Sequence, residues 1–100
     1  MKRLMIRYKV KPEQVVANES LVRDVYGELA RLQPDGLRYA TFKLGDGVSF
    51  VHLAEHGAEN PLQQVEAFQR FQKGIRDRCD ELPVVAELEE IGSYRFSKED

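Results

Sequence analysis

Residues 37–56, LRYATFKLGDGVSFVHLAEH, carry the pattern of a β-hairpin. Two runs rich in β-branched and aromatic residues lie on either side of Gly45-Asp46-Gly47, which is a turn signal. A three-residue turn, closed by Gly47 in the left-handed conformation, pairs Phe42 with Phe50. A two-residue turn shifts every pairing by one position. We predict the first register because it pairs one aromatic residue with another.

Two further strand-like runs and two helix-like runs surround this hairpin. The strand-like runs cover 4–10 and 84–91, and the helix-like runs cover about 13–32 and 60–79. The resulting order, βαββαβ, predicts an α+β, ferredoxin-like fold with two helices on one face of a four-stranded antiparallel sheet. The chain has the length of one domain, which we place at 1–96, with a short extra strand at 94–96 and a frayed tail at 97–100.

Proline, glycine and capping residues mark the ends of these elements. Pro12 ends the first strand, and Gln33-Pro34-Asp35-Gly36 stops the first helix. Asn60 followed by Pro61, with Gln63 at capping-box spacing, is typical of a helix start. We therefore predict one continuous second helix, whose buried stripe is Val65, Phe68, Phe71 (or Gln72), Ile75 and Cys79.

The composition indicates a globular chain and argues against several partners. Apolar residues make up 42% and charged residues 32%, with a formal net charge of −2 and a pI near 5.7. A nucleic-acid partner normally needs a basic face, so we expect none. No apolar run approaches the roughly 20 residues that span a bilayer, so we expect no membrane partner. The single cysteine, Cys79, forms no internal disulfide; we predict no metal site and a cytoplasmic location.

The hairpin is apolar on both of its faces, and two helices on one side of the sheet cannot cover both. We predict that the helix-facing set includes Leu37, Tyr39, Val51 and Leu53 of the hairpin and Val84, Ala86 and Leu88 of the last strand. The patch then left on the open face consists of Phe42, Leu44, Val48, Phe50, Val85 and Ile91. Because soluble monomers rarely leave such a patch bare, we predict a homodimer that packs open face against open face.

The strand order, the run FVHLAEH at 50–56 leading into Asn60, and FQRF at 68–71 resemble the dimeric α+β barrel superfamily, and in particular antibiotic-biosynthesis-monooxygenase-like proteins. The resemblance covers nearly the whole chain. The resemblance implies a two-fold dimer. Members of the superfamily include cofactor-free oxygenases of aromatic polyketides, haem-degrading enzymes and small dimers of no known activity. The haem-degrading branch uses an Asn, a Trp and a His at set places. This chain has none of the three there, so haem degradation is not expected.

Polar residues on the predicted open face are the first site candidates. Alternation places Arg7 and His52 on neighbouring central strands of that face. We predict that His52 acts as a general base or hydrogen-bond donor and that Arg7 holds an anionic oxygen, with Tyr39 or His56 binding substrate at the margin. The alternative is structural: Arg7 pairs with Glu87, and His52 is a hydrogen-bonded interface residue.

A second candidate site lies between the helices and the sheet, with the aromatic lining Tyr8, Tyr26, Tyr39 and Phe68. Aromatic residues at these spacings are also typical of a plain core. Two classes of function stay open. One is a cofactor-independent, monooxygenase-like enzyme acting on a hydrophobic phenolic or quinone-like small molecule. The other is a non-catalytic dimer that binds a small ligand or has a structural role. We predict no cofactor for either.

Overall fold

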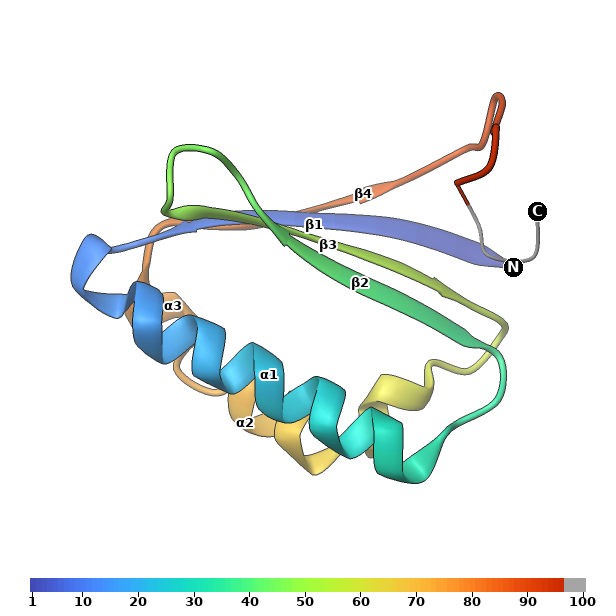
Figure 1. The fold of residues 1–100 in the computed structure, drawn as a ribbon, viewed down its shortest axis with the longest axis horizontal. Helices are drawn as coiled ribbons and strands as arrows, with labels where there is room; N and C mark the ends of the chain where they lie inside the picture. The colour runs from blue at the N-terminus through green and yellow to red at the C-terminus, as the bar shows by residue number, and fades with distance from the viewer. Residues whose placement is uncertain (97–100) are drawn as a thin grey trace.

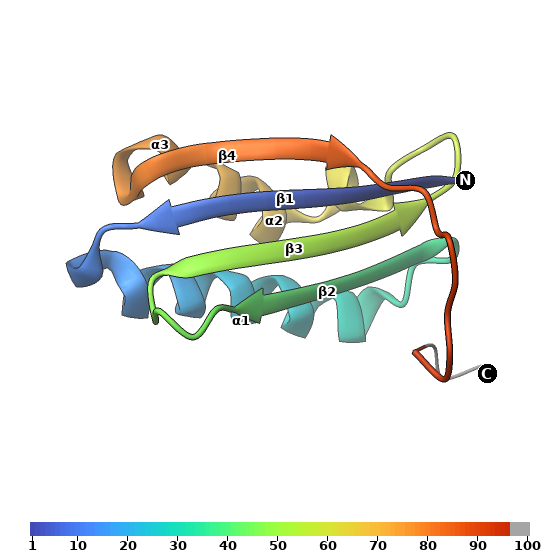
Figure 2. The same ribbon diagram turned by 90° about the horizontal axis from the view of Figure 1, so that it is seen from above.

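Four antiparallel strands form one sheet in the order β2-β3-β1-β4 in the computed structural model, which describes residues 1–96 (Figures 1 and 2). The strands are β1 (Lys2–Val10), β2 (Leu37–Lys43), β3 (Ser49–His56) and β4 (Cys79–Glu87). The helices α1 (Val15–Leu32), α2 (Glu66–Gln72) and α3 (Ile75–Arg78) all lie on one face of the sheet (Figure 1). Short 3-10 turns, η1 (Pro12–Gln14) and η2 (Pro61–Gln64), precede α1 and α2. The predicted α+β, ferredoxin-like fold is confirmed.

Helix α1 follows the prediction closely but buries one residue that is not apolar. Its buried side chains are Asn18, Val22 and Val25. Asn18 is fully shielded from solvent, so it sits among hydrophobic neighbours as a polar group that must find partners. The helix ends at Leu32 because Gln33 adopts a left-handed conformation, with φ of 48°.

The predicted second helix is wrong in its continuity, since the segment is broken into three pieces. Asn60 does cap the first piece: its side-chain oxygen accepts the N–H of Leu62 at 3.0 Å. Helix α2 takes its cap from α1 instead, where Glu28 accepts the N–H of Ala67 at 2.8 Å. Gly74, with φ of 81°, then separates α2 from α3. As a result, helical cover over the sheet is short and interrupted on this side.

The hairpin register differs by one residue from the prediction. Phe42 lies opposite Val51, not Phe50. The cause is Asp46, whose carboxylate accepts the backbone N–H of Val48 at 3.0 Å and of Ser49 at 2.8 Å. These bonds hold a longer loop than a three-residue turn, and Leu44 pairs with Ser49 at its base.

The shift moves β3 onto the opposite assignment of faces. Phe50 and His52 face the helices and are 2% exposed, in register with Tyr8 and Ile6 of β1. The predicted positions of Phe50 and His52 on the open face are therefore wrong, as is the helix-facing position of Val51. Strand β4 also starts earlier than predicted, at Cys79, and ends at Glu87. Its faces are exchanged too, because Val84 and Ala86 lie opposite Arg7 and Met5 on the open side, while Val85 lies opposite Ile6 on the helix side. The observed open face carries Met5, Arg7, Ala40, Phe42, Val51, Leu53, Val84 and Ala86.

After β4 the chain leaves the sheet and runs past the end that carries the N-terminus (Figures 1 and 2). The backbone N–H of Leu88 still bonds to the carbonyl of Arg3 at 2.8 Å. The predicted short strand at 94–96 does not form, and Tyr94 and Phe96 are 80% and 78% exposed. The predicted frayed tail, 97–100, lies outside the described residues. Within 1–96, no helix is both long and apolar enough to span a membrane.

Candidate functional site

A cavity of about 450 Å³ lies between the helix-facing side of the sheet and the broken α2–α3 segment. Its wall is formed mainly by aromatic and aliphatic side chains, among them Ile6, Tyr8, Tyr39, Leu62, Phe68 and Phe71, together with the imidazole of His52. Its mouth lies by β4 and α3, where the lining residues Leu82 and Val85 are 45% and 61% exposed. The volume is within the range of small-molecule sites.

His52 is the centre of a buried hydrogen-bond network beside this cavity. Its Nε2 lies 2.8 Å from the Tyr8 hydroxyl, and its Nδ1 lies 2.6 Å from the Tyr39 hydroxyl and 3.2 Å from Thr41 Oγ1. Burial lowers the pKa of His52 from 6.5 to about 4, because the imidazolium would lose its hydration. His52 is therefore a neutral imidazole at pH 7.

The network continues from Tyr8 toward α1 and the end of α3. Asn18 Nδ2 donates to the Tyr8 oxygen at 2.9 Å, and Arg78 Nε donates to Asn18 Oδ1 at 3.2 Å. Desolvation raises the pKa of Tyr8, while the bond from Asn18 and the charge of Arg78 partly offset that rise. Tyr8 thus keeps its proton at neutral pH.

Arg78 is a buried cation at the far end of the network. The residue is 7% exposed, and its other N–H groups donate to the backbone carbonyls of Phe71 at 2.7 Å and Lys73 at 3.3 Å. Its guanidinium also lies 5.3 Å from the centre of the Phe71 ring, within cation–π range. Within residues 1–96, every partner of this cation is neutral, so burial lowers its pKa.

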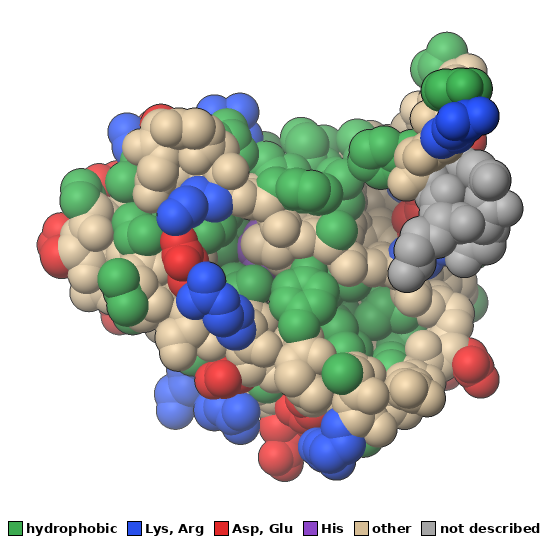
Figure 3. Space-filling view, in the orientation of Figure 1, with side chains coloured by type: hydrophobic (Ala, Val, Ile, Leu, Met, Phe, Trp, Pro, Cys, Tyr) green, Lys and Arg blue, Asp and Glu red, His purple; other side chains and the backbone are tan. Residues whose placement is uncertain are grey.

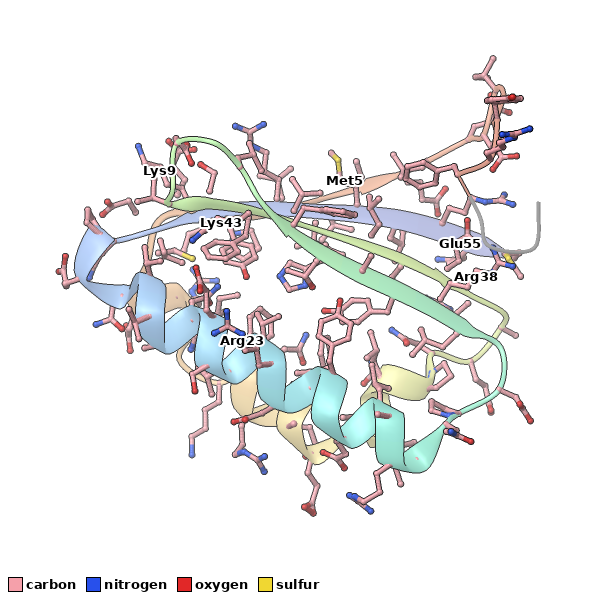
Figure 4. The ribbon with its side chains drawn as sticks, viewed as in Figure 1. Met5, Lys9, Arg23, Arg38, Lys43 and Glu55 are labelled. Carbon is pink, nitrogen blue, oxygen red and sulfur yellow. The ribbon has the colours of Figure 1, made fainter. Side chains whose placement is uncertain are left out.

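At the other end, the network reaches the surface between α1 and β2. Thr41 Oγ1 lies 2.8 Å from the Tyr26 hydroxyl, and Tyr26 lines a shallow groove together with Glu19 and Lys43. Figure 3 shows charged side chains of both signs beside hydrophobic ones on this side of the molecule, and Figure 4 places Lys43 and Arg23 there. Lys43 donates to Glu19 at 2.6 Å. The polar chain therefore runs from the buried Arg78 through His52 to a charged groove.

Aromatic rings pack around His52 and form much of the cavity wall. The Tyr39 ring meets Phe68 edge-on at 6.3 Å, and Phe68 stacks on Phe71 at 6.1 Å. His52 lies 5.2 Å from Phe71. Burial raises the pKa of Tyr39, so its hydroxyl stays protonated as well. The site combines a mostly apolar wall with the hydroxyl of Tyr39, the imidazole of His52 and the cation of Arg76, which suits an aromatic ligand carrying an oxygen.

The structure brings together four of the predicted site residues and separates three. His52, Tyr8, Tyr39 and Phe68 all line the cavity. Tyr26 lies one step behind them, stacked on Tyr39 at 5.4 Å. Arg7 is exposed on the open face, opposite Val51, so the predicted proximity of Arg7 and His52 is wrong. His56 faces the helices but lies four residues further along β3, where its Nδ1 donates to the carbonyl of Gly57 at 2.8 Å.

Sequence reasoning missed Asn18, Thr41 and Arg78. A signal existed for Asn18, because it falls on the buried stripe of the first helix, three residues after Val15 and four before Val22. Arg78 gave no such signal, since it sits among charged residues that read as a solvated helix face. Among the described residues, no three His, Cys, Asp or Glu side chains are grouped so that they could hold one metal ion.

Comparison with solved structures identifies close matches to the whole fold. An antibiotic biosynthesis monooxygenase is 21% identical, with a TM-score of 0.74, covering 92% of this chain and 100% of its own. Rv0793 from Mycobacterium tuberculosis is 15% identical, with a TM-score of 0.69, covering 92% and 96%. SnoaB, a cofactor-independent oxygenase from Streptomyces nogalater, is 16% identical, with a TM-score of 0.65, covering 94% and 96%.

No protein-family model matches the chain, and no curated protein matches it. At these low identities the structural matches speak for the arrangement of the backbone, and the activities in their names belong to those proteins. The chain has the fold of the antibiotic-biosynthesis-monooxygenase-like α+β proteins, as the sequence resemblance predicted.

Proposed function

We propose that this protein binds a planar, hydrophobic small molecule with a phenolic or quinone-like oxygen, in the cavity between the sheet and α2–α3. The observation that carries the proposal is the Tyr39–His52 pair, held at 2.6 Å in the wall of a cavity lined mainly by aromatic and aliphatic side chains. A largely apolar wall favours a flat ring system, while the polar pair fixes the position of one oxygen. The likeness to a cofactor-independent oxygenase supports a reaction without a cofactor.

The reaction that we propose is oxidation of an electron-rich phenol by molecular oxygen without a cofactor. A ring carbon forms a bond to one oxygen atom, and the ring carbon and the phenol oxygen each lose one hydrogen, which gives the quinone. The second oxygen atom leaves as water, and all the electrons come from the substrate. The protein's contribution is to bury the ring, orient it and stabilise the phenolate that reacts with oxygen.

The test is binding and oxygen consumption with 1-naphthol, with 1,4-naphthoquinone as the product-like probe. Val85→Trp places a large side chain at the cavity mouth and should weaken the binding of both probes at least tenfold. Val16→Trp is the matched control, because Val16 lies on α1 away from the cavity and is 81% exposed. Equal binding of the probes by both variants would place the ligand site elsewhere.

A second candidate function is ligand binding without turnover. One observation favours it: both ring nitrogens of His52 are engaged by protein hydroxyl groups, so no free base faces the ligand. The two functions separate in the same experiment. Saturable binding of 1,4-naphthoquinone with no oxygen uptake on 1-naphthol supports the binding protein, whereas stoichiometric oxygen uptake supports the enzyme.

We also propose that a second copy of the chain covers the open face of the sheet. The centre of that face is apolar, and Phe42 and Val84 are 49% and 67% exposed on it. Figure 4 shows Met5 and Lys9 on this side, away from the helices. Packing two such faces about a two-fold axis would remove the apolar centre from water.

The buried thiol of Cys79 forms no disulfide, which supports a cytoplasmic location.

A further inference from the structure

We infer that Arg78, acting through Asn18 and Tyr8, sets the direction of every hydrogen bond around His52, so that Tyr39 presents its O–H to the cavity and the site selects a ligand oxygen that accepts a hydrogen bond. The acceptor is a carbonyl or a phenolate oxygen. This inference rests on the proposed function for the location of the ligand, and it specifies the chemical form that the site binds. It makes Arg78 and Asn18 positioning residues, because neither touches the ligand.

The direction is set first at Asn18. A guanidinium has donors only, so the Asn18 atom that faces Arg78 Nε at 3.2 Å must be the amide oxygen. The amide nitrogen of Asn18 then faces Tyr8 and donates to its oxygen at 2.9 Å. The buried cation thereby fixes the amide, which by itself could sit either way round.

The direction passes next from Tyr8 to His52. With Asn18 donating to its oxygen, Tyr8 has one hydrogen left to place, and His52 Nε2 at 2.8 Å is its one remaining partner in the described part of the chain. Tyr8 therefore donates, and Nε2 is the unprotonated nitrogen. If Tyr8 accepted from Nε2 instead, its own hydroxyl hydrogen would have no acceptor. That would be costly, because Tyr8 is only 2% exposed.

The direction then reaches the cavity through Tyr39. A neutral imidazole with a bare Nε2 carries its hydrogen on Nδ1, which lies 2.6 Å from the Tyr39 oxygen and 3.2 Å from Thr41 Oγ1. Tyr39 thus accepts from His52. Its own hydrogen can bond to Thr41 Oγ1 when the cavity is empty and to a ligand oxygen when one is bound. Thr41 Oγ1 also bonds to the Tyr26 hydroxyl at 2.8 Å, so a ligand oxygen must compete with Thr41 for the Tyr39 hydrogen. In the reverse tautomer, the His52 proton is on Nε2 and Tyr39 donates its hydrogen to Nδ1. Only the lone pairs of the Tyr39 oxygen would then face a ligand.

The chemical consequence is selection for an electron-rich oxygen. A donor aimed into a largely apolar cavity stabilises an oxyanion more than the neutral phenol. A bound phenol should therefore ionise at a lower pH than the same phenol in solution. A quinone carbonyl is accepted for the same reason, whereas a ligand whose only polar group is an ammonium is rejected.

The first test reads the tautomer directly in the protein without ligand. Protein labelled with ¹⁵N in histidine gives two-bond ¹H–¹⁵N correlations that distinguish the two tautomers. We expect the pattern of a proton on Nδ1 of His52 at pH 7. A proton on Nε2 overturns the inference, whether or not any ligand binds.

The second test reverses the direction with one near-isosteric change, Asn18→Asp. The carboxylate can pair with Arg78, but it also faces Tyr8 with an acceptor, so Tyr8 must donate to it and accept from His52. We expect the His52 proton to move to Nε2 in this variant. If the variant fails to fold, the tautomer of the wild-type protein still tests the inference. A folded variant that keeps the His52 proton on Nδ1 contradicts the claim that Asn18 sets the tautomer of His52.

The third test measures the ionisation of bound 1-naphthol by its ultraviolet absorbance across a pH titration. The wild-type protein should lower the pKa of bound naphthol by at least one unit. Tyr39→Phe and Asn18→Asp should both abolish this shift, whereas Tyr94→Phe, at a residue that is 80% exposed, should preserve it. A shift that survives in Tyr39→Phe overturns the inference. Failure of every probe to bind counts against the proposed function instead, while the tautomer measurement stands independently.

Discussion

Acidification from pH 7 to pH 5 should destabilise the folded protein through the buried imidazole of His52. The imidazole is 2% exposed and has neutral partners at both nitrogens, so burial lowers its pKa from 6.5 to about 4. Between these two values the unfolded chain binds a proton that the folded chain does not. Stability is therefore complete above the unfolded pKa and is lost as the pH falls below it toward the folded pKa.

The size of this loss follows from the two pKa values. At pH 5 nearly all unfolded chains carry the proton on His52 and few folded chains do. Integrating the linkage relation from pH 7 to pH 5 gives a loss of about 2 kcal/mol in the free energy of unfolding. For a domain of this size, that loss corresponds to a fall in Tm on the order of 10 °C.

The assay is urea unfolding at fixed protein concentration, followed by circular dichroism at half-unit steps of pH. His52→Gln keeps a donor and an acceptor at the same place but cannot titrate, so its free energy of unfolding should change by less than half as much over the window. A wild-type protein whose stability is flat from pH 7 to pH 5 would refute the burial argument. So would a His52→Gln variant that keeps the full slope.

Three further changes test other parts of the structure. Phe42→Glu, which puts a charge on the apolar open face, should convert a dimer to a monomer of about 11.5 kDa in sedimentation, while Val16→Glu on the outer side of α1 should not. Gly74→Ala should lower the free energy of unfolding by about 1 kcal/mol, because φ is 81° there. Gly27→Ala should raise it by up to about 1 kcal/mol, because Gly27 lies in α1 and an added Cβ would meet open space. Asp46→Ala should speed amide exchange in the hairpin loop at least tenfold, because its carboxylate accepts two backbone N–H groups; unchanged exchange would mean that the loop holds itself.

The strand order and the approximate ends of most elements were predictable because they depend on local patterns. Alternation in β1 placed Tyr8 correctly toward the helices, and Asn60 correctly marked a helical start. The faces of β3 were not predictable in the same way. They depend on the hairpin register, and the register depends on whether Asp46 folds back onto two amides. Pairing Phe42 with Phe50 would stabilise the predicted register. The observed register gains more, from the hydrogen bonds of Asp46 in the loop and from burial of Phe50 in the core.

The candidate site was half predictable for a related reason. Aromatic residues reveal themselves by spacing, so Tyr8, Tyr39 and Phe68 were found. The buried polar residues of the network could not be found by spacing, because Asn, Thr and Arg are also ordinary surface residues. Arg78 follows Asp77 in a charged stretch, and only the break at Gly74 turns it inward. The error of placing His52 beside Arg7 is the register error again, since one residue of slip exchanges the two faces.

The break between α2 and α3 connects the cavity to the network. Gly74 ends the helical path in a left-handed conformation, so helical cover is interrupted beside β4, and Val85 stays 61% exposed at the cavity mouth. The same break leaves backbone carbonyls at the end of α2 without helical partners, and Arg78 donates to those of Phe71 and Lys73. A cation is favoured at a helix C-terminus, which helps to explain how a buried guanidinium without a carboxylate partner is tolerated there. Once the cation is in place, its remaining N–H has to find an acceptor, and that acceptor is Asn18. The helix end that opens the cavity thus also holds the charge that orients the hydrogen bonds along its wall.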